Sequence, residues 1–362
     1  MGHDVIADRY GRLYEQPYQL ARRGHVVLGI CLSYRTADAR DEMHEAGPGS
    51  LRWVGISNGR AGVLSIVMHA YRALRLIRTF KPDIIIGASD AIHVVLGHWI
   101  SRRSHLPFAA DLYDNFEAFG LSRLPGLVPF YRQALRNAAV VTCVSQPLKG
   151  LVKVGYGARG NVFALPSTIS RDLFYPRDKC LARQRLGLPL SGKLIGTAGG
   201  LSREKGIEPV YRTFEALSQK DPTLYLVLAG PIDPTCPPPQ SPRVHYLGML
   251  PHAKVAELFS ALDVAIVYLR DTPYGQYSFP QKAYEIAACG VPMVAARVGA
   301  MVDLLADCPQ ALYEPDDEIS MMHALNAQLA TPMLPTFEIP DWAKMAEEME
   351  RAFFGDKVPS LA

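Results

Sequence analysis

The feature that most constrains the fold is a repeated alternation of short apolar segments with amphipathic helical segments. In the first half, strands are predicted over residues 25–34, 82–88, 106–113 and 138–145, and helices over 12–23, 63–80, 91–103 and 127–137. In the second half, strands are predicted over 193–200, 224–231, 243–250, 263–269 and 292–298, and helices over 206–219, 253–261, 281–289 and 318–329. This alternation predicts α/β architecture with parallel sheets.

The alternation is interrupted once, at VFALPSTISRDLFYP (162–176), which contains two prolines, has no period and is predicted to be a connector. A chain of 362 residues is long enough for two domains, each with its own core. We therefore expect two doubly wound, Rossmann-like domains over 1–170 and 171–339, with ligands at the carboxyl ends of the strands. A terminal amphipathic helix is predicted within 340–362.

The composition excludes several other classes of protein. There is no run of 18 or more uncharged apolar residues, and MGHDVIADRYGR has no apolar signal-peptide core. The six cysteines are scattered without a CxxC pair, as is usual for reduced thiols in the cytoplasm. No group of His, Cys and Asp has metal-ligand spacing, so we expect neither a metal nor a bound cofactor.

The net charge of +3 conceals an asymmetry between the two halves. Residues 1–170 carry 20 Lys and Arg against 12 Asp and Glu, a net charge of +8, whereas residues 171–362 carry 18 against 23, a net charge of −5. A basic first half indicates an anionic partner for that half.

The segment KLIGTAGGLSREKGIEPV (193–210) carries the first candidate site. A predicted strand ends at Gly199 and Gly200, and Lys205 precedes the next helix. Glycines let a ligand approach the backbone, and a lysine at a helix start favours a phosphate. The spacing matches neither a Walker loop nor GxGxxG, and the latter absence argues against a dinucleotide oxidoreductase. A glycine-rich turn beside a solvated lysine remains an equally good interpretation of this segment alone.

The segment SFPQKAYEIAACGVP (278–292) carries the second candidate site. Pro280 suits the first turn of a helix, whose start can hold an anion with Lys282 nearby. Glu285 lies about one turn later on the same side. Its carboxylate either accepts hydrogen bonds from vicinal hydroxyls, as on a ribose, or simply complements the helix dipole.

These segments and their order resemble the GT-B-fold retaining glycosyltransferases of family 4. The resemblance is specific over residues 193–300, weaker before residue 170, and is carried by LPSTISRDLFYP, GGLSREKGIEPV, VHYLGMLPHAKVAELFSALDVAIVYL, FPQKAYEIAACGVPMVAARVGAMVDLL and PDWAKMAEEME. ADRYGRLYEQPYQLARRGHVVLGICLSY resembles the family's first loop, first helix and second strand. The resemblance implies an interdomain cleft, and a last helix that packs on the first domain.

The resemblance also implies roles for individual residues. Lys205 would bind the donor diphosphate, Glu285 the ribose hydroxyls, and Gly11 would face the diphosphate across the cleft. The segment around Gly248 and Met249 would face the base, and the amides of residues 279–281 the phosphates. The implied donor-binding set is Gly11, Gly199, Gly200, Arg203, Lys205, Gly248, Met249, Tyr277, Ser278, Phe279, Pro280, Gln281, Lys282 and Glu285.

This sequence departs from the family pattern at several positions. Gly200 replaces the arginine of the "GRL" motif, for which Arg203 is a candidate substitute. Tyr277 replaces the first glutamate of the E-x7-E pair, so the donor sugar cannot be inferred from it. Tyr113 replaces a histidine after the strand LPFAADLY, which leaves Asp111 and Asp114 as polar candidates there, although Asp114 could equally cap a helix.

Two further expectations follow from this comparison. Tyr113 and Asp114 join Lys205 and Glu285 as the candidate catalytic residues. The family's first strand is largely missing before GHDVIADRYG, so an upstream start codon is a possible explanation.

The resemblance implies glycosyl transfer, with retention, from a UDP-sugar or GDP-sugar to a glycan or lipid-linked acceptor in cell-surface polysaccharide synthesis. No metal and no nucleic acid are expected to take part. Two alternatives stay open: a GT-B-fold UDP-sugar epimerase, whose acid/base pattern we do not find, and a non-catalytic nucleotide-sugar-binding protein.

Basic and apolar residues are interleaved in two helical segments of the first half. Residues 63–80 carry Arg72, Arg75 and Arg78, and residues 121–136 carry Arg123, Arg132 and Arg136. Both segments can touch an anionic membrane, although solvated arginines on ordinary amphipathic helices are the more common explanation for each alone. We expect a cytoplasmic protein with possible peripheral attachment to the inner face of the cytoplasmic membrane.

Overall fold

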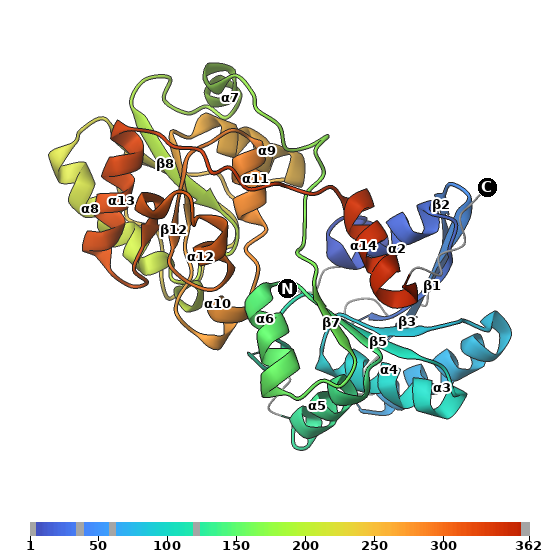
Figure 1. The fold of residues 1–362 in the computed structure, drawn as a ribbon. Coiled ribbons are helices and arrows are strands. Elements are labelled where there is room, and N and C mark those ends of the chain that lie inside the picture. The colour runs from blue at the N-terminus through green and yellow to red at the C-terminus, as the bar shows by residue number, and fades with distance from the viewer. Residues whose placement is uncertain (1–4, 34–39, 58–62, 119–123, 356–362) are drawn as a thin grey trace. The chain divides into compact units, whose positions relative to one another are not determined.

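The structure, a computed structural model, describes residues 5–33, 40–57, 63–118 and 124–355 (Figure 1). The chain divides into two compact units. Unit 1 comprises residues 1–168 together with 341–362, and unit 2 comprises residues 169–340. The chain therefore enters unit 2 once and returns to unit 1 for its last helix.

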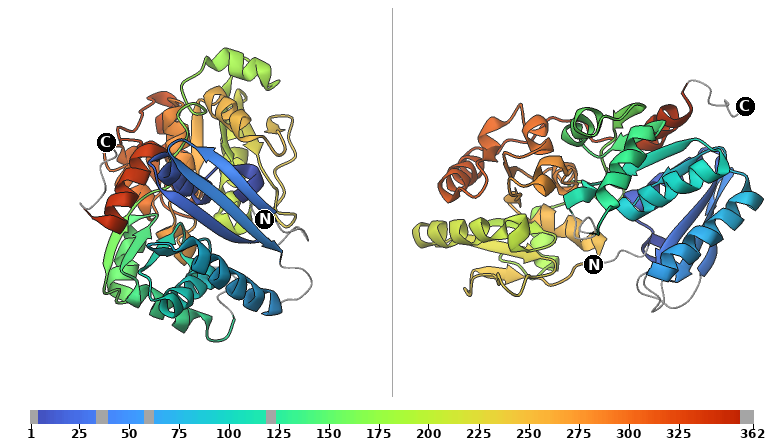
Figure 2. Two further views of the ribbon diagram at one scale, coloured as in Figure 1. Left: turned by 90° about the vertical axis from the view of Figure 1, so that its right-hand side faces the viewer. Right: turned by 90° about the horizontal axis from the view of Figure 1, so that it is seen from below.

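Unit 1 contains two sheets within the described residues. The first has the order β1 (Val26–Ser33), β3 (Gly49–Ser57) and β2 (Arg40–Ala46), and Figure 2 (left) shows these strands in blue. The second is parallel, with the order β4 (Ile85–Gly87), β5 (Phe108–Leu112), β6 (Val140–Cys143) and β7 (Asn161–Ala164). Strands β1 and β3 are parallel, and β2 is antiparallel to β3.

Strands β2, β3 and β7 were not predicted from the sequence. The expectation that residues 162–176 form only a connector is wrong at its start, because Asn161–Ala164 forms β7. This strand has a half-exposed edge and lacks the continuous apolar run of a central strand. In β2 the burial alternates and only two side chains are buried, so RDEMHEA has too few apolar residues to indicate a strand.

The helices of unit 1 are α1 (Val5–Asp8), α2 (Arg12–Arg22), α3 (Val63–Phe80), α4 (Ala91–Ser104), α5 (Leu127–Asn137), α6 (Gln146–Gly150) and α14 (Trp342–Phe354), with short turns at Phe116–Ala118 and Leu151–Gly155. Helix α14 packs against α2. Its buried Glu350 accepts a hydrogen bond from Arg23 at 2.6 Å and lies 2.7 Å from His25 Nε2. These polar contacts and the apolar contact of Met349 with Leu20 fix the last helix to unit 1.

Unit 2 is built on one parallel sheet. Its strand order is β10 (Val244–Tyr246), β9 (Leu224–Ala229), β8 (Lys193–Ala198), β11 (Val264–Val267), β12 (Met293–Ala296) and β13 (Leu312–Tyr313). Every residue of β11 and β12 is buried, as expected for central strands covered on both faces.

The helices of unit 2 fall into two groups that pack on the sheet. Helix α8 (Ile207–Lys220) packs against α13 (Glu318–Ala330), and α9 (His252–Ala261) packs against α7 (Lys179–Arg185) and α11 (Lys282–Ala288) (Figure 1). Shorter elements are η4 (Arg203–Lys205), α10 (Pro273–Tyr277), α12 (Ala300–Leu304) and η5 (Pro309–Ala311). Because neighbouring strands are parallel, the loops that follow β8, β9 and β11 meet at one edge of the sheet.

None of the described helices combines the length and apolar character that a bilayer crossing requires.

Candidate functional site

Two adjacent glycines follow β8 at its carboxyl end. Gly199 has a φ of 123°, a backbone conformation that side chains rarely adopt. A Cβ atom added to Gly199 would lie 3.3 Å from Lys282 Nζ, and one added to Gly200 would lie 3.4 Å from Lys205 Nζ. The absence of side chains at these two positions therefore lets two ammonium groups approach the backbone at the end of the strand.

The two lysines come from different elements, Lys205 from η4 and Lys282 from the first residue of α11. In the described part of the chain, no ion pair joins either lysine to a carboxylate. Burial and the nearby Lys205 charge, opposed by Glu285, together lower the pKa of Lys282 to about 7. The cluster is thus short of negative charge, and an anionic ligand would relieve the repulsion within it.

Two tyrosines surround the lysine pair. Tyr268 donates a hydrogen bond to the carbonyl oxygen of Gly200 at 2.7 Å, and its ring centroid lies 4.6 Å from Lys282 Nζ. Burial raises the pKa of Tyr268, which keeps its hydroxyl group protonated as a donor. The ring of Tyr274 lies 5.9 Å from Lys205 Nζ. These cation–π contacts partly stabilise the ammonium groups while leaving them available to a ligand.

Glu285 lies in the first turn of α11, three residues after Lys282. Its Oε1 atom is 3.4 Å from His252 Nε2 and 3.4 Å from Gln281 Nε2. The Glu285 side chain is 12% exposed, so a ligand hydroxyl can still reach the carboxylate. His252, the first residue of α9, was not predicted as a site residue, because a histidine at a helix start carries no distinctive spacing.

The loop between α10 and α11 contains the other predicted residues of this segment. Ser278 is buried, and its amide donates to Tyr274 O at 3.0 Å. The ring of Phe279 packs against Tyr284. Pro280 has no amide hydrogen, so only Phe279 and Gln281 of the three predicted amide donors can serve. Tyr277 ends α10. The positive charge of this region therefore resides in the lysines more than in the short helix.

Arg203 does not occupy the position predicted for it. Its guanidinium lies 3.3 Å from Glu208 and contacts the carbonyl oxygen of Thr235 at 3.4 Å, on the exposed side of η4. Lys282 lies against Gly199, and Lys205 lies against Gly200, the residue that replaces the arginine of the family motif.

Gly248 and Met249 follow β10 at the same edge of the sheet. The carbonyl oxygen of Gly248 accepts a hydrogen bond from Gly230 N at 2.8 Å, which ties this loop to the end of β9. A Cβ atom on Gly248 would meet nothing within 4 Å, and Met249 is 66% exposed. The loop thus leaves open space beside the lysine-bearing edge.

Three of the predicted site residues, Gly11, Tyr113 and Asp114, belong to unit 1. Gly11 precedes α2 with a φ of 78°, and its carbonyl oxygen accepts from the amides of Tyr14 and Glu15. Asp114 is 8% exposed and accepts from the amide of Asn115 at 2.8 Å. Burial raises the pKa of Tyr113 to about 12, with Asp114 and Asp90 adding to the shift.

Asp111 has a structural partner that the sequence did not reveal. Arg12 donates to its carboxylate at 2.6 and 3.0 Å, and Thr142 donates at 2.5 Å. Arg12 also donates to the carbonyl oxygen of Leu165 at 2.6 Å. Asp111 is 2% exposed. The hypothesis that Asp111 reaches a substrate is therefore wrong in this structure, where the carboxylate is fully engaged inside unit 1.

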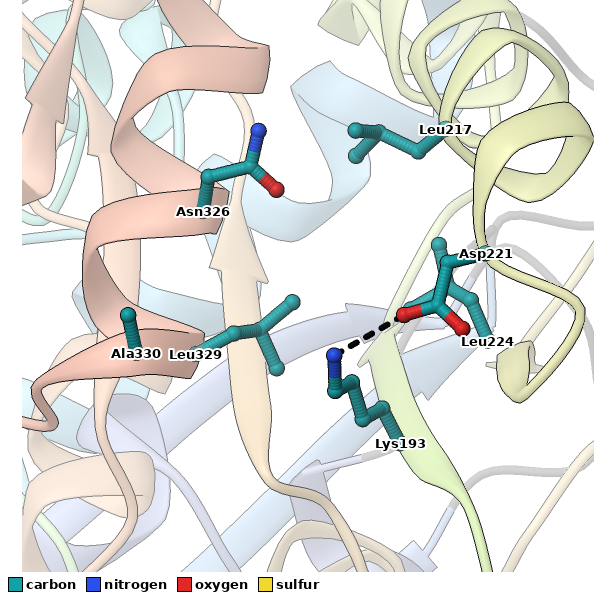
Figure 3. Close-up of a pocket in the computed structure, with 7 residues that line it drawn as sticks. All are labelled: Lys193, Leu217, Asp221, Leu224, Asn326, Leu329 and Ala330. Atoms are coloured by element: carbon teal, nitrogen blue, oxygen red, sulfur yellow. Dashed lines mark hydrogen bonds and ion pairs between the residues drawn. The ribbon is translucent and has the colours of Figure 1, made fainter.

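Unit 2 also has a surface hollow of about 280 Å³, and Figure 3 shows the residues that line it. It is lined by Lys193, Asp221, Leu224 and residues of α8 and α13, and Lys193 Nζ pairs with Asp221 at 2.9 Å. Lys193 and Leu224 begin β8 and β9, so the hollow lies at the amino edge of the sheet. Because ligands of parallel α/β sheets bind at the carboxyl edge, we do not assign the hollow to the site.

Among the described residues, no group of three or more His, Cys, Asp or Glu side chains could hold a metal ion. Near the glycine pair, the described side chains supply the ammonium groups of Lys205 and Lys282 and the hydroxyl group of Tyr268, and the Glu285 carboxylate lies near enough to Lys282 to act on its charge. This donor set fits an anion bearing hydroxyl groups.

Two family models match the chain. The model of glycosyl transferases group 1 matches residues 192–331, and that of the glycosyl transferase 4-like domain matches residues 12–166. Together they span most of both units, and they confirm the family expected from the sequence. Similar solved structures confirm the expected GT-B fold.

Individual glycosyltransferases are also similar to this chain in sequence or in structure. The chain is 27% identical over 296 residues to a D-inositol 3-phosphate glycosyltransferase of Stackebrandtia nassauensis, covering 75% of this chain and 64% of that protein, which is slightly less than two thirds. It is 24% identical to the putative teichuronic acid biosynthesis glycosyltransferase TuaC of Bacillus subtilis, covering 81% and 74%. Alr3699/HepE of Anabaena, solved in complex with UDP, has a TM-score of 0.61 and 19% identity, covering 83% of this chain and 82% of that one.

Proposed function

Because this chain belongs to the glycosyl transferase group 1 family, we propose that it transfers a sugar from a nucleotide-sugar to a hydroxyl group of an acceptor. The observation that carries the proposal is the pair of ammonium groups, on Lys205 and Lys282, against the glycines that end β8. Neither has a carboxylate partner in the described part of the chain. A donor diphosphate supplies the negative charge that the pair lacks.

We propose that the same lysine pair also accelerates the transfer. When the bond from the anomeric carbon to the diphosphate breaks, negative charge grows on the departing phosphate. Lys205 and Lys282 then interact more strongly with the transition state than with the bound donor, and this difference accelerates the reaction. Glu285 accepts hydrogen bonds from the ribose hydroxyls and so fixes the nucleotide relative to the lysine pair.

The proposal includes finer points on the substrates. We favour a UDP-sugar over a GDP-sugar, in keeping with the UDP bound to the Anabaena structure. We propose retention, in which the acceptor attacks the face that the phosphate leaves and the phosphate receives the acceptor proton. The similarity to a teichuronic acid glycosyltransferase supports an acceptor that is a growing cell-surface glycan or its lipid-linked precursor.

We further propose that unit 1 rests on an anionic membrane at which such an acceptor is held. Helix α3 exposes Met68 and Tyr71 together with Arg75 and Arg78, and α4 exposes Trp99. Exposed apolar and basic side chains on one helix favour the interface of an anionic bilayer. The second predicted segment, residues 121–136, lies partly outside the described residues, and Arg123 is among those not described.

The test is release of UDP from a UDP-sugar panel, measured with and without acceptor. An active transferase releases UDP faster with acceptor, and Lys205→Ala lowers that rate by at least about a hundredfold, since it removes a charge-assisted contact made chiefly in the transition state. Lys193→Ala, at the opposite edge of the sheet, is the matched control and keeps the wild-type rate. Binding of UDP-sugar without acceptor-dependent release would instead indicate a non-catalytic binding protein.

Flotation with vesicles of anionic lipid tests the membrane surface. Charge reversal of Arg75 and Arg78 to Glu should abolish flotation at low salt. Equal recovery of wild type and variant with the vesicles would contradict this part of the proposal.

A further inference from the structure

Three titratable side chains of unit 1 form a cluster that the proposed donor site does not include. It consists of Asp90 and His93 at the start of α4 and His69 on α3. Asp90 Oδ1 accepts a hydrogen bond from His93 N at 2.8 Å and lies 2.9 Å from His93 Nδ1. The rings of His69 and His93 meet edge to face, with centroids 5.7 Å apart.

Asp90 lies three residues after the carboxyl end of β4. Ser89, just before it, has a φ of 84°, a left-handed conformation that is strained for a residue with a side chain. Gly87 ends β4, where an added Cβ atom would lie 2.9 Å from Val94 Cα. The strand therefore turns sharply into α4 and aims the Asp90 side chain at the edge where ligands of such sheets bind.

His69 is the buried member of the cluster. It is 4% exposed, and its Nδ1 atom has no hydrogen-bond partner among the described residues. Burial and the nearby His93, opposed by Asp90, together lower the pKa of His69 to about 4, so the ring is neutral at pH 7. A buried ring nitrogen without a partner is costly, and a ligand hydroxyl at this position would satisfy it.

The other two members of the cluster are accessible. The side chain of His93 is 15% exposed and that of Asp90 is 21% exposed. With His93 Nδ1–H donating to Asp90, His93 Nε2 is left as an acceptor. Tyr113, at the end of the neighbouring strand β5, lies close enough to Asp90 for the carboxylate to raise the pKa of its hydroxyl, which stays a donor.

We propose that His69, Asp90 and His93 form a binding site for the hydroxyl groups of a neutral sugar or polyol, with His93 as the residue that recognises the acceptor. This inference rests on the proposed function, since a transferase needs a hydroxyl acceptor. The cluster offers a carboxylate oxygen and a ring nitrogen as acceptors, which match hydroxyl donors. The Asp90 carboxylate repels phosphate, so the site takes the uncharged part of the acceptor.

Histidine ring NMR of the full chain tests the proposal, with myo-inositol and methyl α-D-glucopyranoside as probes. Both polyols should shift the ring signals of His93 and His69, whereas UDP should leave them in place. His93→Gln should weaken polyol binding up to about tenfold, the value of one lost hydrogen bond to a hydroxyl. His98→Gln is the matched control, because His98 lies on the same helix but its ring packs against Phe108.

Asp90→Asn separates binding from a purely structural role. Asparagine caps a helix as well as aspartate does, so α4 and the melting temperature should be retained. The polyol affinity should nevertheless fall about tenfold, because the carboxylate that orients His93 is gone.

Three results would overturn the proposal. They are ring signals unmoved by either polyol, a larger response to inorganic phosphate than to the polyols, and wild-type polyol affinity in His93→Gln. A failure of UDP to bind would instead contradict the proposed donor chemistry of unit 2, so the two failures can be told apart.

Discussion

Replacing Lys282 by methionine should make the ligand-free protein more stable and bind UDP more weakly. Methionine keeps an unbranched apolar chain of similar length beside Tyr268 and removes the ammonium group. Burial and the charge of Lys205 lower the Lys282 pKa from 10.5 to about 7. That change corresponds to about 5 kcal/mol against the charged form in the folded state.

The effect on stability follows from the protonation of the two states. At pH 7 the unfolded chain carries Lys282 charged, whereas about half of the folded molecules have lost this proton. The lysine therefore destabilises unit 2 by roughly 2–4 kcal/mol at neutral pH, the lower figure allowing for water that reaches this partly buried side chain. Lys282→Met removes that destabilisation.

The pH dependence has a definite sign. Because the folded-state pKa is the lower one, the unfolded state binds more protons between pH 7 and 10, and wild-type stability rises with pH across that window. The slope approaches about 1.4 kcal/mol per pH unit. Lys282→Met lacks this slope, and its advantage over wild type shrinks as the pH rises.

Hydrogen exchange of peptides from β8 and β11 measures the opening of unit 2 directly. Intrinsic tryptophan fluorescence would not, since Trp53, Trp99 and Trp342 all belong to unit 1. The affinity for UDP should fall about 10–100-fold, as expected for the loss of a charge-assisted hydrogen bond. Lys193→Met, which removes a surface ion pair, is the control for both measurements. A Lys282→Met protein that is less stable than wild type, or binds UDP equally well, would refute the reasoning.

UDP binding above pH 7 should take up close to one proton, because the diphosphate restores the charge of Lys282. Calorimetry in buffers of different ionisation enthalpy measures this proton uptake. Binding without proton uptake at pH 8 would contradict the prediction. Glu285→Gln should weaken UDP binding about tenfold yet leave 2′,3′-dideoxy-UDP unaffected; equal losses for both nucleotides would show that Glu285 does not contact the ribose. Asp111→Asn should destabilise unit 1 by about 3 kcal/mol, since it leaves Arg12 buried without its partner, and urea unfolding followed by tryptophan fluorescence tests this.

The central strands of the unit 2 sheet could be predicted well, whereas β3, the central strand of the first sheet of unit 1, was not predicted. The runs that became β11 and β12 are continuously apolar because both faces are covered, and β8 is buried in all but its first residue, so the sequence marks these strands clearly. Strands β2 and β7 lie at sheet edges, where water satisfies the polar face. Their residues are therefore compatible with loops, and periodicity alone does not identify them.

The candidate site was predicted in part, and what was missed has a physical reason. Gly199, Lys205 and Glu285 stand in motifs with short, fixed spacing. The pairing of Arg12 with Asp111 joins residues 99 positions apart and depends on the tertiary fold. The position of Lys282 against Gly199 likewise appears only when α11 packs beside the end of β8.

The central claim is that the lysine pair at the end of β8 binds the diphosphate of a sugar nucleotide. Calorimetric titration of wild type, Lys205→Met and Lys193→Met with UDP and with uridine tests it most directly. We predict that wild type and Lys193→Met bind UDP far more tightly than uridine, and that Lys205→Met loses most of this difference. Equal preference for UDP in all three proteins would contradict the claim.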